Sequence, residues 1–372
     1  MLKSRFPNAM LPMEFGNRRP MQNRLFFSSM GLDLCDGDGL PKPDFFKLYE
    51  SLIEGGCGFG FLCNASVDLA SRYNSKGLKI VSERHAEALA PLIDFARSRG
   101  VSLGVQLQHY GAQAADADAT TPSPRMSEEA IEDCIGQFVR AALLARKAGA
   151  PMVQLQAANG YLLSSFLSPY TNHRTDAWGG TPTKRARLVV TIVDRILQAT
   201  QGDLAVSIRL GIDDGLGDVG QQPAFLTQVV QDLEQAGVAS IECSVGLRKT
   251  FGSFFSDNDK TLEILRNGCR LLGHDLRIPI GFTGSVVSVA QADEIIGAGD
   301  ADFVGFARAV LADNQLVAKE LAGDFDAVHR CLGDAFCFRD KKETTADRVF
   351  CCVNPAYPRP KRLQDLYEDG LR

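Results

Sequence analysis

Two amides and a phenol follow a buried segment of the chain at close spacing. Residues 152–155 are mostly apolar and come directly after a helix end predicted at Gly149, so they predict a buried strand. Gln156, Asn159 and Tyr161 stand at the end of this strand. Uncharged hydrogen-bond donors at the carboxyl end of a buried strand are typical of the catalytic face of a barrel enzyme. Any one of them alone would be better explained as a polar cap satisfied by its neighbours, so only the whole string indicates catalysis.

The elements that must position these residues alternate between strand and helix patterns. About eight short apolar runs are separated by helical patterns, which predicts a parallel sheet closed by crossover helices. The strands are expected at residues 25–29, 58–63, 102–107, 152–156, 204–210, 240–244, 278–283 and 302–306. We therefore expect an α/β fold, a single (β/α)8 TIM barrel over residues 1–330, with a C-terminal extension over residues 331–372 packed on the barrel.

Capping residues predict where two of the helices begin and end. Ser127 precedes two glutamates, which is typical of an N-cap with acidic residues near the helix dipole, and Gly149 ends the same helix. Pro223 predicts the start of a second helix, and Gly237 predicts its end.

Composition limits the class of protein. The chain has 372 residues, 45% of them hydrophobic, and a net charge of −5, which suits one large barrel acting on a small-molecule substrate. Acidic and basic residues are interspersed, so we expect no surface for nucleic acid and none for an anionic membrane. The amino terminus lacks the apolar core of a signal peptide, and no window approaches about 18 uninterrupted apolar residues, so we expect a cytoplasmic protein.

Two loops predict a phosphate site independently of the string after residue 151. Gly284 and Ser285 follow the seventh expected strand, and Ala307 and Arg308 follow the eighth. Loops after strands seven and eight are the usual phosphate-binding loops of such barrels, which use backbone N–H groups and a helix N-terminus. One glycine–serine pair would be weak evidence, whereas two such loops in this order carry more weight.

The segment 151–187 resembles the signature of the old yellow enzyme family, the FMN-dependent ene-reductases and their relatives. The matching positions occur in order at residues 159–162, 166–169, 172–176 and 179–180. The resemblance extends over nearly the whole chain, and so many matches at fixed spacing are specific. One departure concerns the chemistry, because the family usually has a histidine where this chain has Gln156.

The resemblance implies FMN as the cofactor and NAD(P)H as the reductant. Ser29, Met30 and Gly31 match the motif beside the flavin, and Gly31 replaces the threonine or cysteine that usually hydrogen-bonds the flavin C4 oxygen. Gln106 matches the amide that contacts the flavin pyrimidine edge, where an amide is suited because it offers a donor and an acceptor together. Arg209 matches the cation beside flavin N1 and O2. The two loops described above match the phosphate site of the family.

The resemblance also implies how a substrate is handled. NAD(P)H would reduce the flavin and leave, and an electron-poor alkene would then bind in the same place. Gln156 and Asn159 would hold its carbonyl group while Tyr161 gives a proton to the α-carbon. Two neutral amides should stabilise an oxyanion less than an imidazolium does, with a flatter pH dependence. The region 245–270, which contains Phe251, is expected to form part of the pocket wall.

The chain contains ten cysteines, scattered along its length. We expect the first six to be buried, reduced thiols. The last four are Cys331, Cys337, Cys351 and Cys352. They resemble the region of larger relatives, such as 2,4-dienoyl-CoA reductase and trimethylamine dehydrogenase, where four cysteines hold a [4Fe–4S] cluster. Here Asp334 stands where the second cysteine should be and Cys337 is one place early for the third, so we do not expect an intact iron–sulfur cluster.

Several alternatives stay open. The same site could run oxidatively, as a desaturase or an amine or alcohol dehydrogenase, and the departures at Gly31, Ala112 and Gln156 leave room for an FMN-binding protein with little turnover. An RNA enzyme similar to dihydrouridine synthases would need a basic face. A metal-dependent barrel enzyme would need carboxylate and histidine ligands at the strand ends. The substrate, the choice between NADH and NADPH, and assembly into homo-oligomers are left open, and we expect the reductant to reach the flavin from solution.

Overall fold

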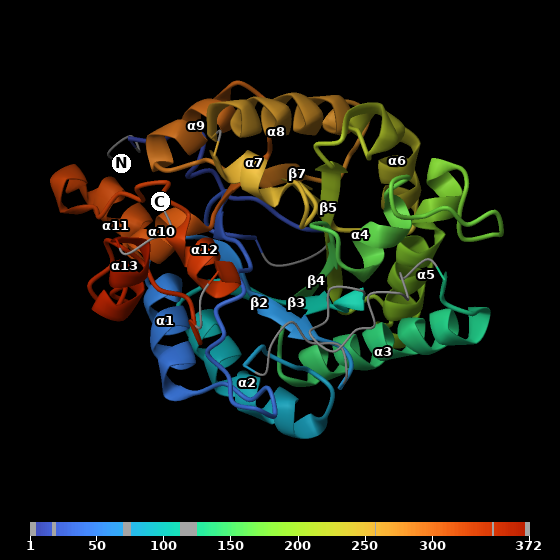
Figure 1. Ribbon diagram of the computed structural model, residues 1–372, viewed down its shortest axis with the longest axis horizontal. Helices are drawn as coiled ribbons and strands as arrows, with labels where there is room; N and C mark the ends of the chain where they lie inside the picture. Colours follow the sequence, from blue (N-terminus) through green and yellow to red (C-terminus); the bar gives the residue numbers. More distant parts are fainter. Residues whose placement is uncertain are drawn as a thin grey trace.

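Eight parallel strands close into a barrel in the order of the chain (Figure 1). The structure is a computed structural model that describes residues 5–16, 20–69, 76–111, 125–256, 258–343 and 346–368. The strands are β1 (Leu25–Phe27), β2 (Phe59–Ser66), β3 (Ser102–Gln108), β4 (Met152–Ala157), β5 (Ala205–Asp213), β6 (Ser240–Val245), β7 (Ile280–Thr283) and β8 (Phe303–Phe306). This order confirms the predicted (β/α)8 TIM barrel.

Helices surround the barrel (Figure 1). The outer helices are α1 (Pro43–Ile53), α2 (Glu83–Ser98), α3 (Glu128–Lys147), α5 (Pro182–Thr200), α6 (Thr227–Gln235), α8 (Asn258–Gly273), α9 (Val289–Gly297), α10 (Arg308–Ala312) and α11 (Leu316–Ala322). The additional helices are α4 (Leu162–Leu167), α7 (Phe251–Ser256), α12 (Phe336–Glu343) and α13 (Lys361–Glu368). Of the helices in the described chain, none has the length and apolar character needed to span a membrane.

All eight predicted strands are present, and their boundaries differ from the prediction by a few residues. β2 and β5 extend furthest, to Ser66 and Asp213. In β2 the pairing with β3 resumes after a register shift between Leu62 and Ala65. The strand therefore continues past its apolar run, because the backbone ladder defines it rather than the side-chain pattern alone.

The capping prediction is confirmed for one helix and is wrong in detail for the other. The Ala130 backbone N–H donates to Ser127 Oγ at 3.2 Å, and Gly149 after α3 has a φ of 89°. Pro223, however, begins a short 3-10 turn, Pro223–Phe225, and α6 begins only after this turn. The Leu226 backbone N–H bonds to the Pro223 carbonyl oxygen at 2.9 Å, which is the tighter i to i+3 pattern.

Aromatic side chains fill the amino ends of the strands. Phe26 stacks on Phe59 with ring centroids 4.8 Å apart, and Phe303 meets Phe26 edge-on at 5.5 Å. Phe15, from the segment before β1, packs on the same cluster with its ring 5.1 Å from that of Phe59. All four side chains are at most 1% exposed. Because such burial is the dominant stabilising contribution, this end of the barrel provides stability and leaves the carboxyl end for chemistry.

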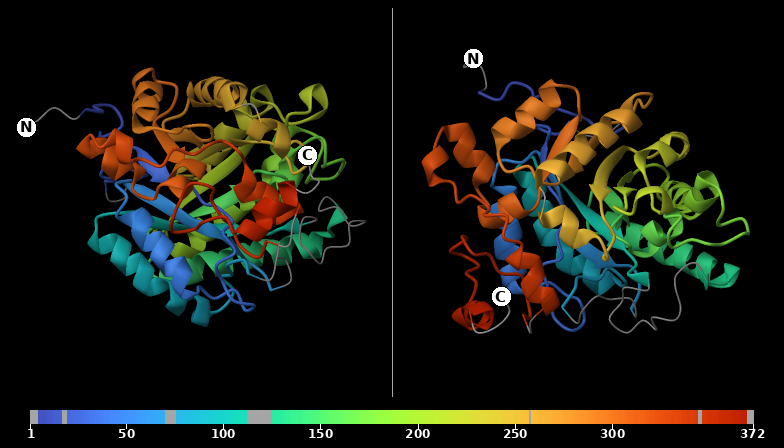
Figure 2. Two further views of the ribbon diagram at one scale, coloured as in Figure 1. Left: turned by 60° about the vertical axis from the view of Figure 1, so that its left-hand side comes forward. Right: turned by 45° about the horizontal axis from the view of Figure 1, so that its top comes forward.

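The C-terminal extension packs on the barrel beside α1 and α10 (Figures 1 and 2). Arg348 Nη1 lies 2.7 Å from Asp44 Oδ2 in α1, and Asn354 Nδ2 donates to a carbonyl oxygen of α10 at 2.8 Å. Within the extension, the buried Arg359 donates two hydrogen bonds to Asp340, at 2.7 and 2.8 Å. The division of the chain at residue 330 stays a prediction.

Candidate active site

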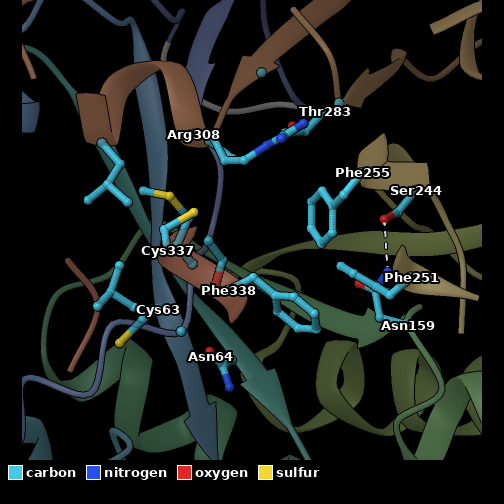
Figure 3. A pocket seen from close by; sticks show the side chains of 18 of the residues that line it. Cys63, Asn64, Asn159, Ser244, Phe251, Phe255, Thr283, Arg308, Cys337 and Phe338 are labelled. Atoms are coloured by element: carbon cyan, nitrogen blue, oxygen red, sulfur yellow. Dashed lines mark hydrogen bonds between the residues drawn. The ribbon is translucent and has the colours of Figure 1, made fainter. Parts of the chain in front are cut away.

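A cavity of about 400 Å³ is formed at the carboxyl ends of the barrel strands. It is lined by all twelve residues that the sequence predicted for the site: Ser29, Met30, Gly31, Gln106, Gln156, Asn159, Tyr161, Arg209, Gly284, Ser285, Ala307 and Arg308. Figure 3 shows Arg308 and Thr283 toward one end of this cavity, and Asn159 with Ser244 on another side. The fold thus brings together residues that are spread over most of the chain.

The charged residues of the loop after α4 do not line this cavity. Arg174 Nη1 donates to the Met126 carbonyl oxygen at 2.7 Å, and its Nε donates to Asp176 Oδ1 at 3.0 Å. The Asp176 carboxylate also accepts from the Trp178 backbone N–H at 3.0 Å. The hydrogen bonds from Arg174 hold the pKa of Asp176 below its usual range. Arg174 and Asp176 therefore stabilise the conformation of the loop.

Asn159 adopts a left-handed backbone conformation, with a φ of 63°, which residues other than glycine rarely do. Its Nδ2 lies 3.0 Å from the Val245 carbonyl oxygen and 3.4 Å from Ser244 Oγ, the contact dashed in Figure 3. A carbonyl oxygen only accepts hydrogen bonds, so the Asn159 amide nitrogen must face β6. Gln156 Nε2 lies 3.4 Å from Asn159 Oδ1, and Gln156 Oε1 is buried with no hydrogen-bond partner among the described residues.

Tyr161 stands at the N-cap position of α4, and a second tyrosine packs against it. The Tyr110 ring meets the Tyr161 ring edge-on, with centroids 5.5 Å apart and an interplanar angle of 82°. Burial raises the pKa of Tyr110 well above its usual range, and the nearby Tyr161 hydroxyl adds to the shift. The Tyr110 hydroxyl oxygen accepts from Asn64 Nδ2 at 2.6 Å. No pattern in the sequence predicted the contacts of Tyr110 and Asn64. Ala112, one of the departures from the family named above, lies outside the described residues.

Two of the predicted flavin contacts are oriented by neighbouring strands. Gln106 Nε2 donates to Gln154 Oε1 at 2.7 Å. Arg209 Nη1 donates to the Ser29 carbonyl oxygen at 3.2 Å, and Arg209 Nε lies 3.3 Å from Glu242 Oε1. The barrel interior therefore sets the orientation of both side chains.

The loops after β7 and β8 meet at Asn258, the first residue of α8. Ser285 Oγ and Arg308 Nη2 both donate to Asn258 Oδ1, at 3.2 and 2.9 Å. Gly284 and Ser285 have φ values of 153° and 57°. The Arg308 guanidinium carbon lies 4.8 Å from the centre of the Phe255 ring, and Arg308 Nη1 is buried without a hydrogen-bond partner among the described residues. A cation with a spare donor beside a tight turn suits a phosphate group.

Aromatic side chains from two distant parts of the chain form one wall of the cavity (Figure 3). Phe251 and Phe255 of α7 have ring centroids 4.8 Å apart, and Phe338 of α12 lies 5.4 Å from Phe255. The expectation that the region 245–270 forms part of the wall is confirmed. The contribution of Phe338 was not foreseen, because the C-terminal segment offered only its cysteine pattern.

The first six cysteines are buried and free, as predicted. Cys331 and Cys337 line the cavity, and burial raises the pKa of Cys337 to about 12 even though Arg308 lowers it. Among the residues that the structure describes, no three side chains of histidine, cysteine, aspartate or glutamate are grouped so that they could hold a metal ion. The lack of an iron–sulfur cluster stays a prediction.

Several buried polar atoms of the cavity have no hydrogen-bond partner among the described residues. They are Ser29 Oγ, both amide atoms of Gln108, Gln156 Oε1, Arg209 Nε, Thr283 Oγ1 and Arg308 Nη1. Each such group costs on the order of 1–3 kcal/mol unless a partner is supplied. Their concentration in one cavity indicates that a polar ligand completes the site. Gln108 and Thr283 were not among the predicted site residues, although they stand close in the sequence to Gln106 and Gly284, which were.

Comparison with known proteins gives matches over most of the chain. The sequence model of the NADH:flavin oxidoreductase / NADH oxidase family matches residues 10–323. The chain is 26% identical to an NADH oxidase of Thermoanaerobacter brockii, covering 94% of this chain and 56% of that protein. It is 29% identical to an NADPH dehydrogenase of Bacillus subtilis (strain 168), covering 79% of this chain and 88% of that protein.

A solved structure of 2-naphthoyl-CoA reductase in complex with 2-naphthoyl-CoA has the same fold. Its TM-score is 0.85 at 21% identity, and the match covers 98% of this chain and 58% of the solved chain. The chain therefore spans little more than half the length of this reductase and of the T. brockii oxidase.

Proposed function

The chain belongs to the NADH:flavin oxidoreductase / NADH oxidase family, and on this premise we propose that it reduces electron-poor carbon–carbon double bonds, with FMN as its cofactor and NAD(P)H as the reductant. One observation carries the proposal: the carbonyl-binding and proton-donating candidates Gln156, Asn159 and Tyr161 line the same cavity as the candidate flavin contacts. FMN held in this cavity would supply the hydride-transfer chemistry between a nicotinamide and the second substrate.

The residues of the cavity fit this cofactor. The unpaired atoms Ser29 Oγ, Thr283 Oγ1 and Arg308 Nη1 and the unpaired Gln108 amide call for a ligand with several donors and acceptors. Ser285 and Arg308 would hold the phosphate group. Ser29, Met30 and Gly31 after β1, with Gln106 and Arg209, would hold the flavin ring. These roles rest on the match to the family's motifs and on the shared cavity.

Arg209 would act on the cofactor electrostatically. A fixed cation beside a ring that gains negative charge on reduction stabilises the reduced form. Gly31 would leave the reduced form less stabilised, because glycine offers no side-chain donor to the flavin C4 oxygen. The two positions together should set the potential of the bound cofactor.

Uncharged side chains would bind the substrate carbonyl group and donate the proton. Gln156 keeps one amide N–H without a partner in the described chain, and this N–H would donate to a substrate carbonyl oxygen. The Asn159 amide, turned toward β6, would hold Gln156 in place. Tyr161 would give the proton to the α-carbon, with its ring held by the edge contact to Tyr110. Neutral donors stabilise an oxyanion less than a cation does, so the substrates should be alkenes that are already strongly polarised.

An anaerobic visible spectrum tests the proposal. The purified protein should show flavin absorbance that bleaches on adding NADH or NADPH and returns on adding a cyclic enone, with mass spectrometry showing a product two hydrogens heavier. A flavin that neither nucleotide bleaches, but that an amine or alcohol reduces, would establish the oxidative direction instead. A protein that binds no flavin would refute the proposal. Product formation that is unaffected in Tyr161→Phe would refute the assignment of the proton donor.

A further inference from the structure

A fully buried carboxylate lies beneath the candidate flavin contacts. Glu242 in β6 is 0% exposed. It faces the barrel interior, where an unpaired charge would be strongly unfavourable. Glu242 was not among the predicted site residues, since one glutamate in an apolar strand carries no motif.

Two hydrogen bonds and one ion pair, from three different strands or their ends, satisfy this carboxylate. Glu242 Oε1 accepts from Ser28 Oγ at 2.9 Å and lies 3.3 Å from Arg209 Nε, while Oε2 accepts from Gln154 Nε2 at 2.8 Å. Arg209 and Glu242 are also register partners in neighbouring strands. Gln154 reaches Glu242 across β5, which contributes the small Ser207 at the register position beside Gln154.

The charge of Glu242 fixes the direction of a hydrogen-bond relay. A carboxylate only accepts, so Gln154 must turn its amide nitrogen toward Glu242. The Gln154 carbonyl oxygen is then left to accept from Gln106 Nε2, at 2.7 Å. The Gln106 amide is thereby held with its nitrogen toward Gln154, and its carbonyl oxygen has no partner among the described residues. An amide can distinguish donor from acceptor positions on a ring edge only if its nitrogen and its oxygen cannot exchange places. The hydrogen bonds from Gln106 through Gln154 to Glu242 prevent that exchange.

The same carboxylate partly neutralises the cation. Arg209 Nη1 also donates to Ser28 Oγ at 3.3 Å, so Ser28 bridges the two charged groups. A guanidinium paired at short range exerts a smaller field on its surroundings than an unpaired one, and in a buried site the difference is little screened. The strength of Arg209 as a stabiliser of negative charge therefore depends on Glu242.

We propose that Glu242 is a positioning residue for the cofactor, orienting Gln106 through Gln154 and holding Arg209 directly, and that its negative charge lowers the redox potential of the bound flavin. This inference rests on the proposed function, because it requires FMN in the cavity. It concerns residues that do not themselves line the cavity, since neither Glu242 nor Gln154 is among the lining residues.

The test measures the midpoint potential and the dissociation constant of FMN in Glu242→Gln. The substitution keeps the shape and removes the charge, so Arg209 acts on the flavin uncompensated. We expect the affinity for reduced over oxidised FMN to rise roughly tenfold, which for two electrons is about 30 mV of higher potential. Glu242→Asp keeps the charge and should stay near the wild-type potential. A wild-type potential in Glu242→Gln would overturn the role of the charge.

Two further variants separate the relay from general loss of stability. Gln154→Leu breaks the path to Gln106 but keeps the Glu242–Arg209 pair, so the dissociation constant of FMN should rise roughly tenfold without a higher potential. Glu320→Gln is the matched control, because Glu320 is also 0% exposed, pairs with Arg330 and accepts from the Val289 backbone N–H at 2.7 Å, yet does not line the cavity. It should leave both quantities unchanged.

The outcomes distinguish this inference from the proposed function. A wild-type protein that binds no FMN refutes the function itself. A wild-type protein that binds FMN, with Gln154→Leu binding it equally well, overturns the relay. Gln154→Leu still decides the question if Glu242→Gln does not fold, since an unchanged dissociation constant contradicts the proposal on its own.

Discussion

Gly305→Ala should damage both the stability of the barrel and its cofactor site. Gly305 lies in β8 between two register partners, Phe26 in β1 and Thr283 in β7. A Cβ atom at this position would lie 2.0 Å from Thr283 Oγ1 and 2.4 Å from the nearest carbon of the Phe26 ring. Favourable contact begins near 3.5 Å, so Thr283 Oγ1 would have to move by about 1.5 Å and the Phe26 ring by about 1 Å.

Neither neighbour can move freely. Phe26 is stacked on Phe59 in the fully buried cluster at the amino ends of the strands. Thr283 is followed directly by Gly284 and Ser285 of the candidate phosphate loop, so a displacement there would be transmitted to the loop. Overpacking of a tight core costs about 1–3 kcal/mol, and with two clashing neighbours we expect about 3 kcal/mol.

Urea unfolding of the apoprotein and titration with FMN measure the two effects. Gly305→Ala should lose about 3 kcal/mol of unfolding free energy and bind FMN about tenfold more weakly. The control is Gly37→Ala, whose Cβ would have no neighbour within 4 Å and which should change stability by less than about 1 kcal/mol. If Gly305→Ala behaved like Gly37→Ala in both measurements, β7 and β8 would shift more easily than their packing indicates, and this prediction would be refuted.

Three further predictions concern the chemistry and the pH dependence. Tyr161→Phe should slow alkene reduction by about 100-fold while leaving reduction of the flavin by NAD(P)H nearly intact; equal losses in the two half-reactions, followed by stopped-flow absorbance, would contradict its role. Gln156→His should raise turnover with a simple cyclic enone, and no gain in steady-state rate would argue against the weak-donor explanation. Burial lowers the pKa of His109 below 6.5 although Asp68 opposes the shift. Below about pH 6.5 the unfolded chain therefore takes up a proton that the native protein does not, so the free energy of unfolding should fall as the pH drops. In His109→Asn, the urea midpoint should lack this part of its dependence on pH.

The sequence predicted the barrel from local patterns, and it predicted most of the cavity lining from the resemblance to the family's motifs. Apolar runs identify strands, and in a parallel barrel the carboxyl ends of all strands meet at one face. Residues as far apart as Ser29 and Arg308 were assigned to one site through their match to the family's motifs, and the closed barrel brings them to one cavity. The error at Pro223 has a local cause as well, since a proline at a helix start fits a 3-10 turn and an α-helix equally well.

The sequence could not predict the partners that orient the site. Gln154 and Glu242 are 88 residues apart, and Asn258 binds Ser285 and Arg308 from 27 and 50 residues away. Such contacts depend on which side chains the closed barrel turns toward each other. The same holds for Asn159, whose residue type suggested a free donor until its amide was found to face the Val245 carbonyl oxygen.

The two ends of the barrel divide stability and chemistry in a way that explains the unpaired polar atoms. At the amino ends, aromatic rings such as Phe26 and Phe59 fill the interior. At the carboxyl ends, Gln108 and Thr283 are buried without partners, although each costs stability in the absence of a ligand. That cost is tolerable only because the apolar end supplies the compensating burial, and it is recovered when a ligand supplies the missing partners. A site of this kind binds its cofactor through groups that the fold has already desolvated and oriented, which favours a tightly held flavin over a transient one.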